Sequence, residues 1–157
     1  MQSGAKTKRT ADQATLDIVA QSEHERCLIC GASNPFGLKL RFRVADDRSV
    51  VGLFPCKEGL QSYPETLHGG VISALLDAAM TNALFAIGIV AVTAELSIRF
   101  LAPVVLNHGA VVRATVEETS YHPLYNLRAE LEQDREIRAR ATAKFLVRGC
   151  FGPSHDQ

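Results

Sequence analysis

The chain has 157 residues, 46% of them hydrophobic, and its 17 basic side chains balance 17 acidic ones. This length fits one domain with a substantial hydrophobic core, and the balanced charge gives no electrostatic basis for binding nucleic acid or an anionic membrane. The longest apolar segment, Val71 to Val92, is interrupted by Asp77, Thr81 and Asn82, so it does not read as a membrane span. We therefore expect a single domain with neither nucleic acid nor a membrane as partner.

The N-terminal segment differs in composition from the rest of the chain. Met1 to Gln13 is polar and basic and lacks the apolar region of a secretory signal, so we predict a cytoplasmic protein. Asp12 to Glu25 has the modest apolar periodicity of a short helix. We divide the chain into a leader or short helix at 1–23, a domain at 24–149 and a C-terminal tail at 150–157.

Four cysteines occur, Cys27, Cys30, Cys56 and Cys150, and the first two form a C-x-x-C motif. A zinc site that adds His24 and a distant fourth ligand is one interpretation of this motif, and redox chemistry is another. A structural zinc site usually has two such pairs, and a redox motif usually opens a helix, whereas this one precedes a turn-rich stretch. We favour reduced cysteines that pack a loop, and we expect no metal.

Six segments show the two-residue alternation of half-buried strands. Two of them precede the longest apolar segment and four follow its start, at residues 37–44, 49–55, 92–101, 109–119, 124–132 and 137–147. The last four are joined by short connections, which predict hairpins and therefore antiparallel pairing.

Between the two groups of strands, residues 67–87 indicate a helix that ends near Gly88. Its apolar residues occur on every side, so we expect it to be buried all round. One antiparallel sheet curling around this helix satisfies every element. Because a single sheet cannot cover every side of a helix, we expect a second copy of the chain to cover the remainder. This predicts a homodimer, which can assemble further to a homotetramer through its outer faces.

One carboxylate, Asp77, lies inside this apolar helix, where a charge is costly unless it is paired, neutralised or in use. The helix opens with His68-Gly69-Gly70, where free backbone N–H groups can bind a carbonyl oxygen that gains charge. Asp77 can attack as a nucleophile or activate water as a general base. Burial raises the pKa of such a carboxyl and hydrogen bonds lower it, and the sequence leaves the balance open.

The spacing of these two features restricts how they can cooperate. Nine residues of α-helix advance about 13.5 Å and end half a turn away from where they began. His68 and Asp77 of one chain therefore cannot both contact one reacting atom. We predict a composite site, in which the helix start of one chain meets Asp77 of the other in a two-fold dimer.

Three sequence blocks carry a resemblance to a known family: Leu67-His68-Gly69-Gly70, Leu76-Asp77, and Thr93-Ala94-Glu95-Leu96-Ser97-Ile98-Arg99-Phe100-Leu101-Ala102-Pro103. Through them the chain resembles the hotdog-fold acyl-CoA thioesterases, in particular the phenylacetate-pathway type within the 4-hydroxybenzoyl-CoA thioesterase superfamily. The resemblance covers about residues 24 to 147. It implies an α+β hotdog fold, with one curved antiparallel sheet wrapped around a long central helix.

The resemblance also implies an activity, the hydrolysis of acyl-CoA thioesters with small to medium or aromatic acyl groups and without a cofactor. It assigns the nucleophile or base to Asp77 and the oxyanion-binding N–H to Gly69. His68 would help to shape the oxyanion hole, and the hydroxyl of Thr93 would assist water.

The substrate-binding residues are less well defined. The family commonly has an Asn six residues before the His, and here that position is Ser62, preceded by Gln61. These two residues, together with Gly70 and with Arg99 as a partner for the phosphates of coenzyme A, are the substrate-binding candidates. The departure at Ser62 leaves a second interpretation open, an acyl-CoA-binding hotdog protein that does not hydrolyse its ligand.

Overall fold

The computed structural model describes residues 9–118 and 120–148, so the start of the predicted leader, the predicted tail at 150–157 and Cys150 lie outside the described residues. Two helices and one 3-10 turn accompany six strands. In chain order they are α1 (Gln13–His24), β1 (Phe42–Val44), β2 (Val50–Pro55), η1 (Glu58–Leu60), α2 (Gly69–Phe85), β3 (Ala91–Phe100), β4 (Gly109–Val116), β5 (Leu124–Gln133) and β6 (Glu136–Val147).

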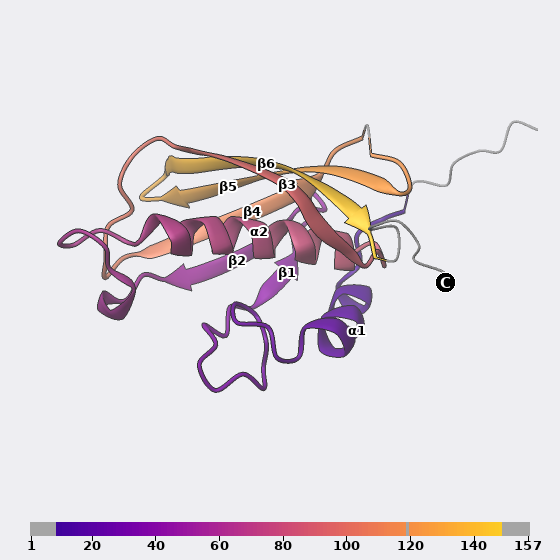
Figure 1. The fold of residues 1–157 in the computed structure, drawn as a ribbon, viewed down its shortest axis with the longest axis horizontal. Helices are drawn as coiled ribbons and strands as arrows, with labels where there is room; N and C mark the ends of the chain where they lie inside the picture. Colours follow the sequence, from indigo (N-terminus) through magenta and orange to yellow (C-terminus); the bar gives the residue numbers. More distant parts are fainter. Residues whose placement is uncertain (1–8, 119, 149–157) are drawn as a thin grey trace, which may run out of the picture.

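The strands form one sheet in the order β1-β2-β4-β5-β6-β3, and every neighbouring pair is antiparallel. Figure 1 shows α2 running along one face of this curved sheet, with α1 near the C-terminal end of α2. The helix packs against five of the six strands, β2 to β6. The predicted hotdog architecture is thereby confirmed. Neither α1 nor α2 has the length and hydropathy of a membrane-spanning helix.

The core lies between the sheet and α2. Every second residue of β5 faces the helix, so Leu127, Ala129 and Leu131 are buried while their neighbours are not. The same alternation on β6 presents the buried alanines Ala139 and Ala141, whose small side chains let the helix approach the sheet closely. The two-residue alternation predicted for β4, β5 and β6 is confirmed by their burial.

Within one chain α2 is not buried all round, as the prediction that a second copy covers part of it requires. Eleven of its 17 residues are buried. The less buried positions include Gly70, Ser73, Ala74 and Asp77, whose spacing by three and four residues aligns them along one side of a helix. We call these four residues the open stripe of α2. The sheet covers much of the rest of the helix, and α1 packs against its C-terminal part.

The predicted strand at Gly37–Val44 is wrong over its first half, because only the last three residues pair as β1. Lys39 has a φ of 57°, which breaks the extended run. The N–H groups of Leu38 and Leu40 donate to the carbonyl oxygens of Leu28 and Ile29 instead of to a neighbouring strand. We call the segment at 25–36, which carries Cys27 and Cys30, the cysteine loop. The alternation correctly predicted that Leu40 is buried, but it could not indicate which segment supplies the backbone partners.

Strand β3 forms one edge of the sheet and pairs with β6 alone. A β-bulge interrupts its register between Thr93 and Glu95. Thr93 and Ile98 are five residues apart, so strict alternation would put them on opposite faces of the strand. The bulge instead turns both toward the helix side, where Thr93 contacts α2 and Ile98 packs on the core. The edge exposes large apolar side chains, namely Val92, Leu96, Phe100 and the adjacent Leu101.

Candidate active site

The N-terminus of α2 is capped by a side chain that the sequence alone did not identify as a cap. His68 has extended backbone angles, and its Nδ1 accepts the N–H of Gly70 at 2.8 Å. A Cβ on Gly70 would lie 3.0 Å from that nitrogen, so glycine is what allows the ring to fold over the helix end. Because Nδ1 accepts, the neutral imidazole of His68 carries its proton on Nε2.

The cap leaves a particular backbone donor unclaimed. Val71 donates its N–H to the carbonyl oxygen of His68, and Gly70 donates to the ring, whereas the N–H of Gly69 has no partner among the described residues. This donor lies at the positive end of the helix dipole. A Cβ added to Gly69 would sit 3.6 Å from the ring of Phe100, so that ring borders the same spot.

Two turns further along α2, the carboxylate of Asp77 is half-buried and held by the next strand. Thr93 donates its hydroxyl to Oδ1 of Asp77 at 2.6 Å. Burial raises the pKa of Asp77 above its ordinary value, and the hydrogen bond from Thr93 opposes that shift. The negative charge of Cys27 raises the pKa further, and His24 lowers it. The result is a carboxylate that is more basic than one in water and is held in one orientation.

The distance between the two features follows from the helix. Gly69 and Asp77 both lie on the unbroken α2, eight residues apart, which separates them by about 12 Å along the axis. In one chain the unclaimed N–H and the carboxylate therefore do not form a single centre, as the sequence spacing indicated.

The loop before α2 holds the next two candidates. Gln61 pairs with Leu67, and its side-chain oxygen accepts the N–H of Glu65 at 3.2 Å. Ser62 donates its hydroxyl to the carbonyl oxygen of Thr66 at 3.5 Å. Both side chains are exposed but engaged within their own loop, beside the start of α2 and not beside Asp77. The N–H of the remaining candidate on the helix, Gly70, is engaged by His68.

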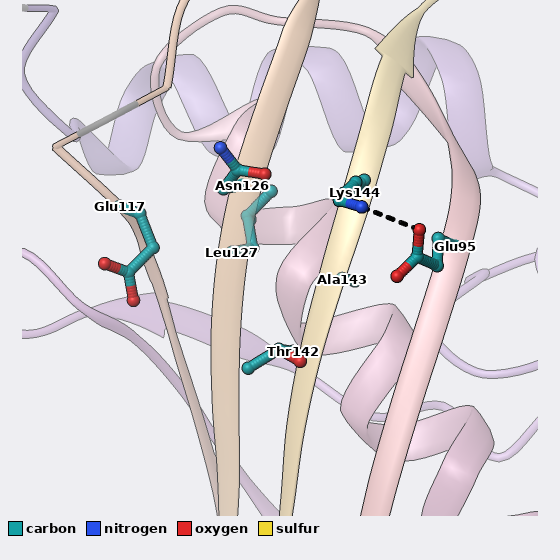
Figure 2. Close-up of a pocket in the computed structure, with 7 residues that line it drawn as sticks. All are labelled: Glu95, Glu117, Asn126, Leu127, Thr142, Ala143 and Lys144. Carbon is teal, nitrogen blue, oxygen red and sulfur yellow. Dashed lines mark hydrogen bonds and ion pairs between the residues drawn. The ribbon is translucent and has the colours of Figure 1, made fainter.

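Arg99 is exposed on β3, where it lies opposite Arg140 in the register with β6. Another basic side chain nearby, Lys144, is paired with Glu95 at 2.8 Å. Figure 2 shows this pair at a pocket of about 200 Å³ between β3, β5 and β6, formed chiefly by side chains that point away from α2. None of the predicted site residues lines this pocket, so it is separate from Asp77.

The sequence drew attention to the C-x-x-C motif and His24, but it did not indicate that they lie beside α2. The ring of His24 packs edge-on against Phe85 with 4.8 Å between centroids, which fixes the end of α1 against the end of α2. Asn82 of α2 donates to the sulfur of Cys30 at 3.7 Å. The His24 and C-x-x-C spacing was visible in the sequence, but its closeness to α2 depends on tertiary packing.

The Thioesterase superfamily model matches residues 65–122, which include all of α2 and β3. No curated protein sequence matches the chain. Among solved structures, the PaaI protein of the E. coli phenylacetic acid degradation operon superposes with a TM-score of 0.73 at 18% identity, covering 87% of this chain and 96% of that one. A thioesterase superfamily protein superposes with a TM-score of 0.69 at 22% identity over 74% of this chain, which spans only 60% of that protein's length.

A hypothetical thioesterase from Streptococcus pneumoniae, solved with coenzyme A, superposes with a TM-score of 0.64 at 18% identity, covering 70% of this chain and 89% of that one. Structures of the same protein also carry alanine in place of an aspartate and in place of a threonine. Those two positions are 16 residues apart, which is also the separation of Asp77 and Thr93. The family-model match confirms the predicted resemblance over residues 65–122, and the structural matches show the hotdog fold.

Proposed function

We propose that this protein hydrolyses acyl-CoA thioesters whose acyl group is small to medium or aromatic, with Asp77 as its catalytic carboxylate. The observation that carries the proposal is the half-buried carboxylate of Asp77, oriented by Thr93 at 2.6 Å, within the segment that matches the superfamily. The Streptococcus protein with coenzyme A supports the carrier thiol, and its altered aspartate and threonine support the Asp77–Thr93 pair.

The reaction needs an acceptor for oxyanion charge and a base or nucleophile. The thioester carbonyl oxygen accepts the N–H of Gly69, which stabilises it as it becomes negative. Asp77 either attacks the carbonyl carbon and is then released by water, or takes a proton from the attacking water. In both cases the C–S bond breaks and coenzyme A leaves as a thiolate. The water molecule that supplies the new oxygen of the acid also supplies the proton that the thiol finally carries. His68 shapes the oxyanion site by withdrawing the N–H of Gly70, and Thr93 keeps Asp77 oriented and assists water.

Since Gly69 and Asp77 are about 12 Å apart in one chain, we propose that two chains build each site. The open stripe of α2 ends at Asp77 and consists otherwise of small residues, which suits close approach by the same helix of a second copy. The apolar residues exposed on the edge strand β3 suit the same interface. A two-fold axis between the helices then brings Gly69 of one chain toward Asp77 of the other. Further assembly of this dimer to a homotetramer is part of the proposal.

The remaining assignments concern the substrate and the compartment. We propose that Gln61, Ser62 and Gly70 border the thioester near the oxyanion site and that Arg99 faces the phosphates of coenzyme A. The described cysteines Cys27, Cys30 and Cys56 form no disulfide, which suits the reducing cytoplasm.

A second candidate is an acyl-CoA-binding protein of the same fold that does not hydrolyse its ligand. One observation favours it: the side chains of Gln61 and Ser62, which stand where the family commonly has an Asn, are engaged within their own loop. Protection of the fold by acyl-CoA without any thiol release, over aromatic and aliphatic acyl groups of graded length, would favour this candidate over the hydrolase.

The experiment that tests the hydrolase removes a single donor. Gly69 is the first residue of α2 and follows a residue in extended conformation, so proline fits there and deletes only the N–H. In a thiol-release assay, Gly69→Pro is expected to lower kcat by roughly 10²–10³. Gly69→Ala is the matched control, because it keeps the N–H and its methyl makes only an ordinary contact with Phe100. Equal activity of the two variants would overturn the oxyanion assignment.

Mixing two inactive variants tests the shared site. When Gly69→Pro and Asp77→Asn chains are unfolded together and refolded, half of the dimers combine both, and each of these has one intact site and one doubly altered site. Activity is therefore expected to return to about a quarter of the wild-type value. If each chain held its own complete site, mixing would restore nothing.

A further inference from the structure

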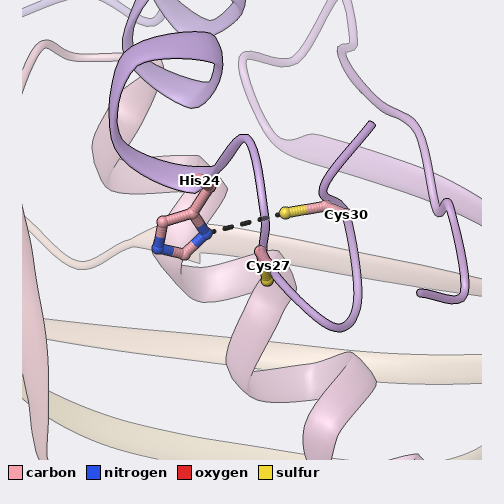
Figure 3. A group of neighbouring side chains, drawn as sticks. All are labelled: His24, Cys27 and Cys30. Carbon is pink, nitrogen blue, oxygen red and sulfur yellow. Dashed lines mark hydrogen bonds between the residues drawn. The ribbon is translucent and has the colours of Figure 1, made fainter. Parts of the chain in front are cut away.

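His24, Cys27 and Cys30 bring one imidazole nitrogen and two sulfur atoms together where α1 ends (Figure 3). These potential ligand atoms all lie within 4.8 Å of one another, and Nδ1 of His24 is 3.6 Å from the sulfur of Cys30. In tetrahedral zinc sites, bonds of about 2.3 Å to sulfur and 2.0 Å to nitrogen put neighbouring ligand atoms roughly 3.5–3.8 Å apart. The cluster is therefore close to the size that a zinc ion requires.

The backbone around the two cysteines is arranged to support thiolates. The N–H of Ile29 donates to the sulfur of Cys27 at 3.4 Å, a bond that favours the charged form of the ligand. The N–H of Gly31 closes the turn by donating to the carbonyl oxygen of Cys27 at 2.9 Å. A Cβ on Gly31 would lie 2.3 Å from the backbone nitrogen of Cys27, so only glycine allows this turn.

The surroundings give the cluster a fixed outer shell and a route to solvent. Asn82 donates to the sulfur of Cys30, and the ring of His24 rests against Phe85, so two of the three ligands are held by α2. A cavity of about 430 Å³ is lined by His24, Cys30 and Asn82 together with residues of α1 and β1. It provides an entry path for an ion and room for a water molecule.

We propose that His24, Cys27 and Cys30 bind one Zn²⁺ ion, with a solvent molecule as the fourth ligand. Two thiolates and an imidazole are a donor set that suits zinc, and among residues 9–118 and 120–148 no further His, Cys, Asp or Glu joins the group. The ion fastens the end of α1 to the cysteine loop and so stabilises the layer that covers the C-terminal half of α2. This assignment replaces the packing role expected for the cysteines from the sequence. It does not depend on the proposed hydrolysis, because its test uses no substrate.

The test measures metal content and coordination. The protein is purified under reducing conditions from zinc-supplemented cells and then dialysed. Elemental mass spectrometry is expected to find about one zinc ion per chain. Cys27→Ser and Cys30→Ser are expected to lower this content at least tenfold. Cys56→Ser is the matched control, since Cys56 is a buried thiol outside the cluster, and it is expected to retain the ion. Replacement of zinc by Co²⁺ is expected to give a thiolate-to-cobalt charge-transfer band in the wild type and Cys56→Ser only.

Stability gives an independent readout if a serine variant fails to fold. A chelator is expected to lower the Tm of the wild type, and added Zn²⁺ is expected to restore the Tm. The restored protein is again expected to give the charge-transfer band when Co²⁺ replaces the zinc. Zinc content in the wild type no higher than in Cys27→Ser, retention of zinc by both serine variants, or a Cys27–Cys30 disulfide in the reduced preparation would each overturn the assignment.

Discussion

The hydrogen bond from Thr93 to Asp77 can be tested by its effect on the pH dependence of turnover. Thr93→Val keeps the shape of the side chain and removes the hydroxyl that donates to Oδ1 at 2.6 Å. Because this bond opposes the rise that burial causes, its loss is expected to raise the pKa of Asp77 further. If Asp77 must be ionised to act, the enzyme then loses activity at a higher pH than the wild type does as the pH is lowered.

The size of the shift follows from the strength of the bond. A hydrogen bond to a charged group contributes about 1.5–3 kcal/mol, and the partial exposure of Asp77 favours the lower part of that range. At 1.36 kcal/mol per pKa unit, about 1.5–2 kcal/mol corresponds to a rise of roughly 1–1.5 units. The acid limb of a plot of kcat/KM against pH is expected to move upward by that amount, whatever happens to the height of the plateau.

The assay is thiol release from one acyl-CoA across the pH range, with Thr81→Val as the matched control. The hydroxyl of Thr81 donates to the backbone carbonyl oxygen of Asp77 at 3.0 Å and does not bond its carboxylate, so the same substitution there should leave the acid limb in place. An acid limb that coincides in Thr93→Val and the wild type, or that moves equally in both variants, would refute the role given to this hydrogen bond.

Three further predictions concern stability and assembly. Burial raises the folded-state pKa of Asp77, so its protonated form stabilises the fold below the unfolded-state pKa, and this contribution is lost as the pH rises through the folded-state pKa. Asp77→Asn is therefore expected to raise the Tm at pH 7, measured by calorimetry, while turnover falls roughly 10²–10⁴-fold. A lower Tm would contradict the direction of the pKa shift. Gly70→Ala puts a methyl group 3.0 Å from Nδ1 of His68 and is expected to cost about 1 kcal/mol in urea unfolding through the lost cap, whereas Gly59→Ala, whose methyl meets nothing within 4 Å, should change less than about 0.5 kcal/mol. Leu96→Lys on the exposed edge of β3 is expected to give folded, inactive monomers in sedimentation experiments, and an active monomer would refute the shared site.

Much of the fold could be predicted because its patterns are local. The helix expected at 67–87 is observed as Gly69–Phe85, and the last four strands fall within a few residues of their expected bounds. The first half of the segment at 37–44 failed because Lys39 leaves the extended region and the neighbouring N–H groups bind the cysteine loop. An alternating pattern reports which side chains are buried, and it contains no information about a partner segment that lies elsewhere in the chain.

The candidate site divides in the same way. The carboxylate of Asp77 and the N–H of Gly69 could be found from the sequence, since a charge in an apolar helix and a glycine at a helix start are local signals. The partner of Asp77 was named from the resemblance, but it reaches the helix only through a bulge in β3 that the alternation did not indicate. The position of Cys27 beside α2 arises from the packing of α1 on α2, which no local pattern reports.

Because α2 is unbroken, it also restricts where insertions and deletions can occur in the sequence of such a protein. Each residue inserted or deleted between Gly69 and Asp77 rotates the helix by about 100°. A one-residue insertion there would bring Leu76, and not Asp77, to the position that faces Thr93. The loop at 56–65 has no such constraint from helix geometry. Insertions and deletions among functional relatives are therefore expected to occur in the loops and to be absent from the first half of α2.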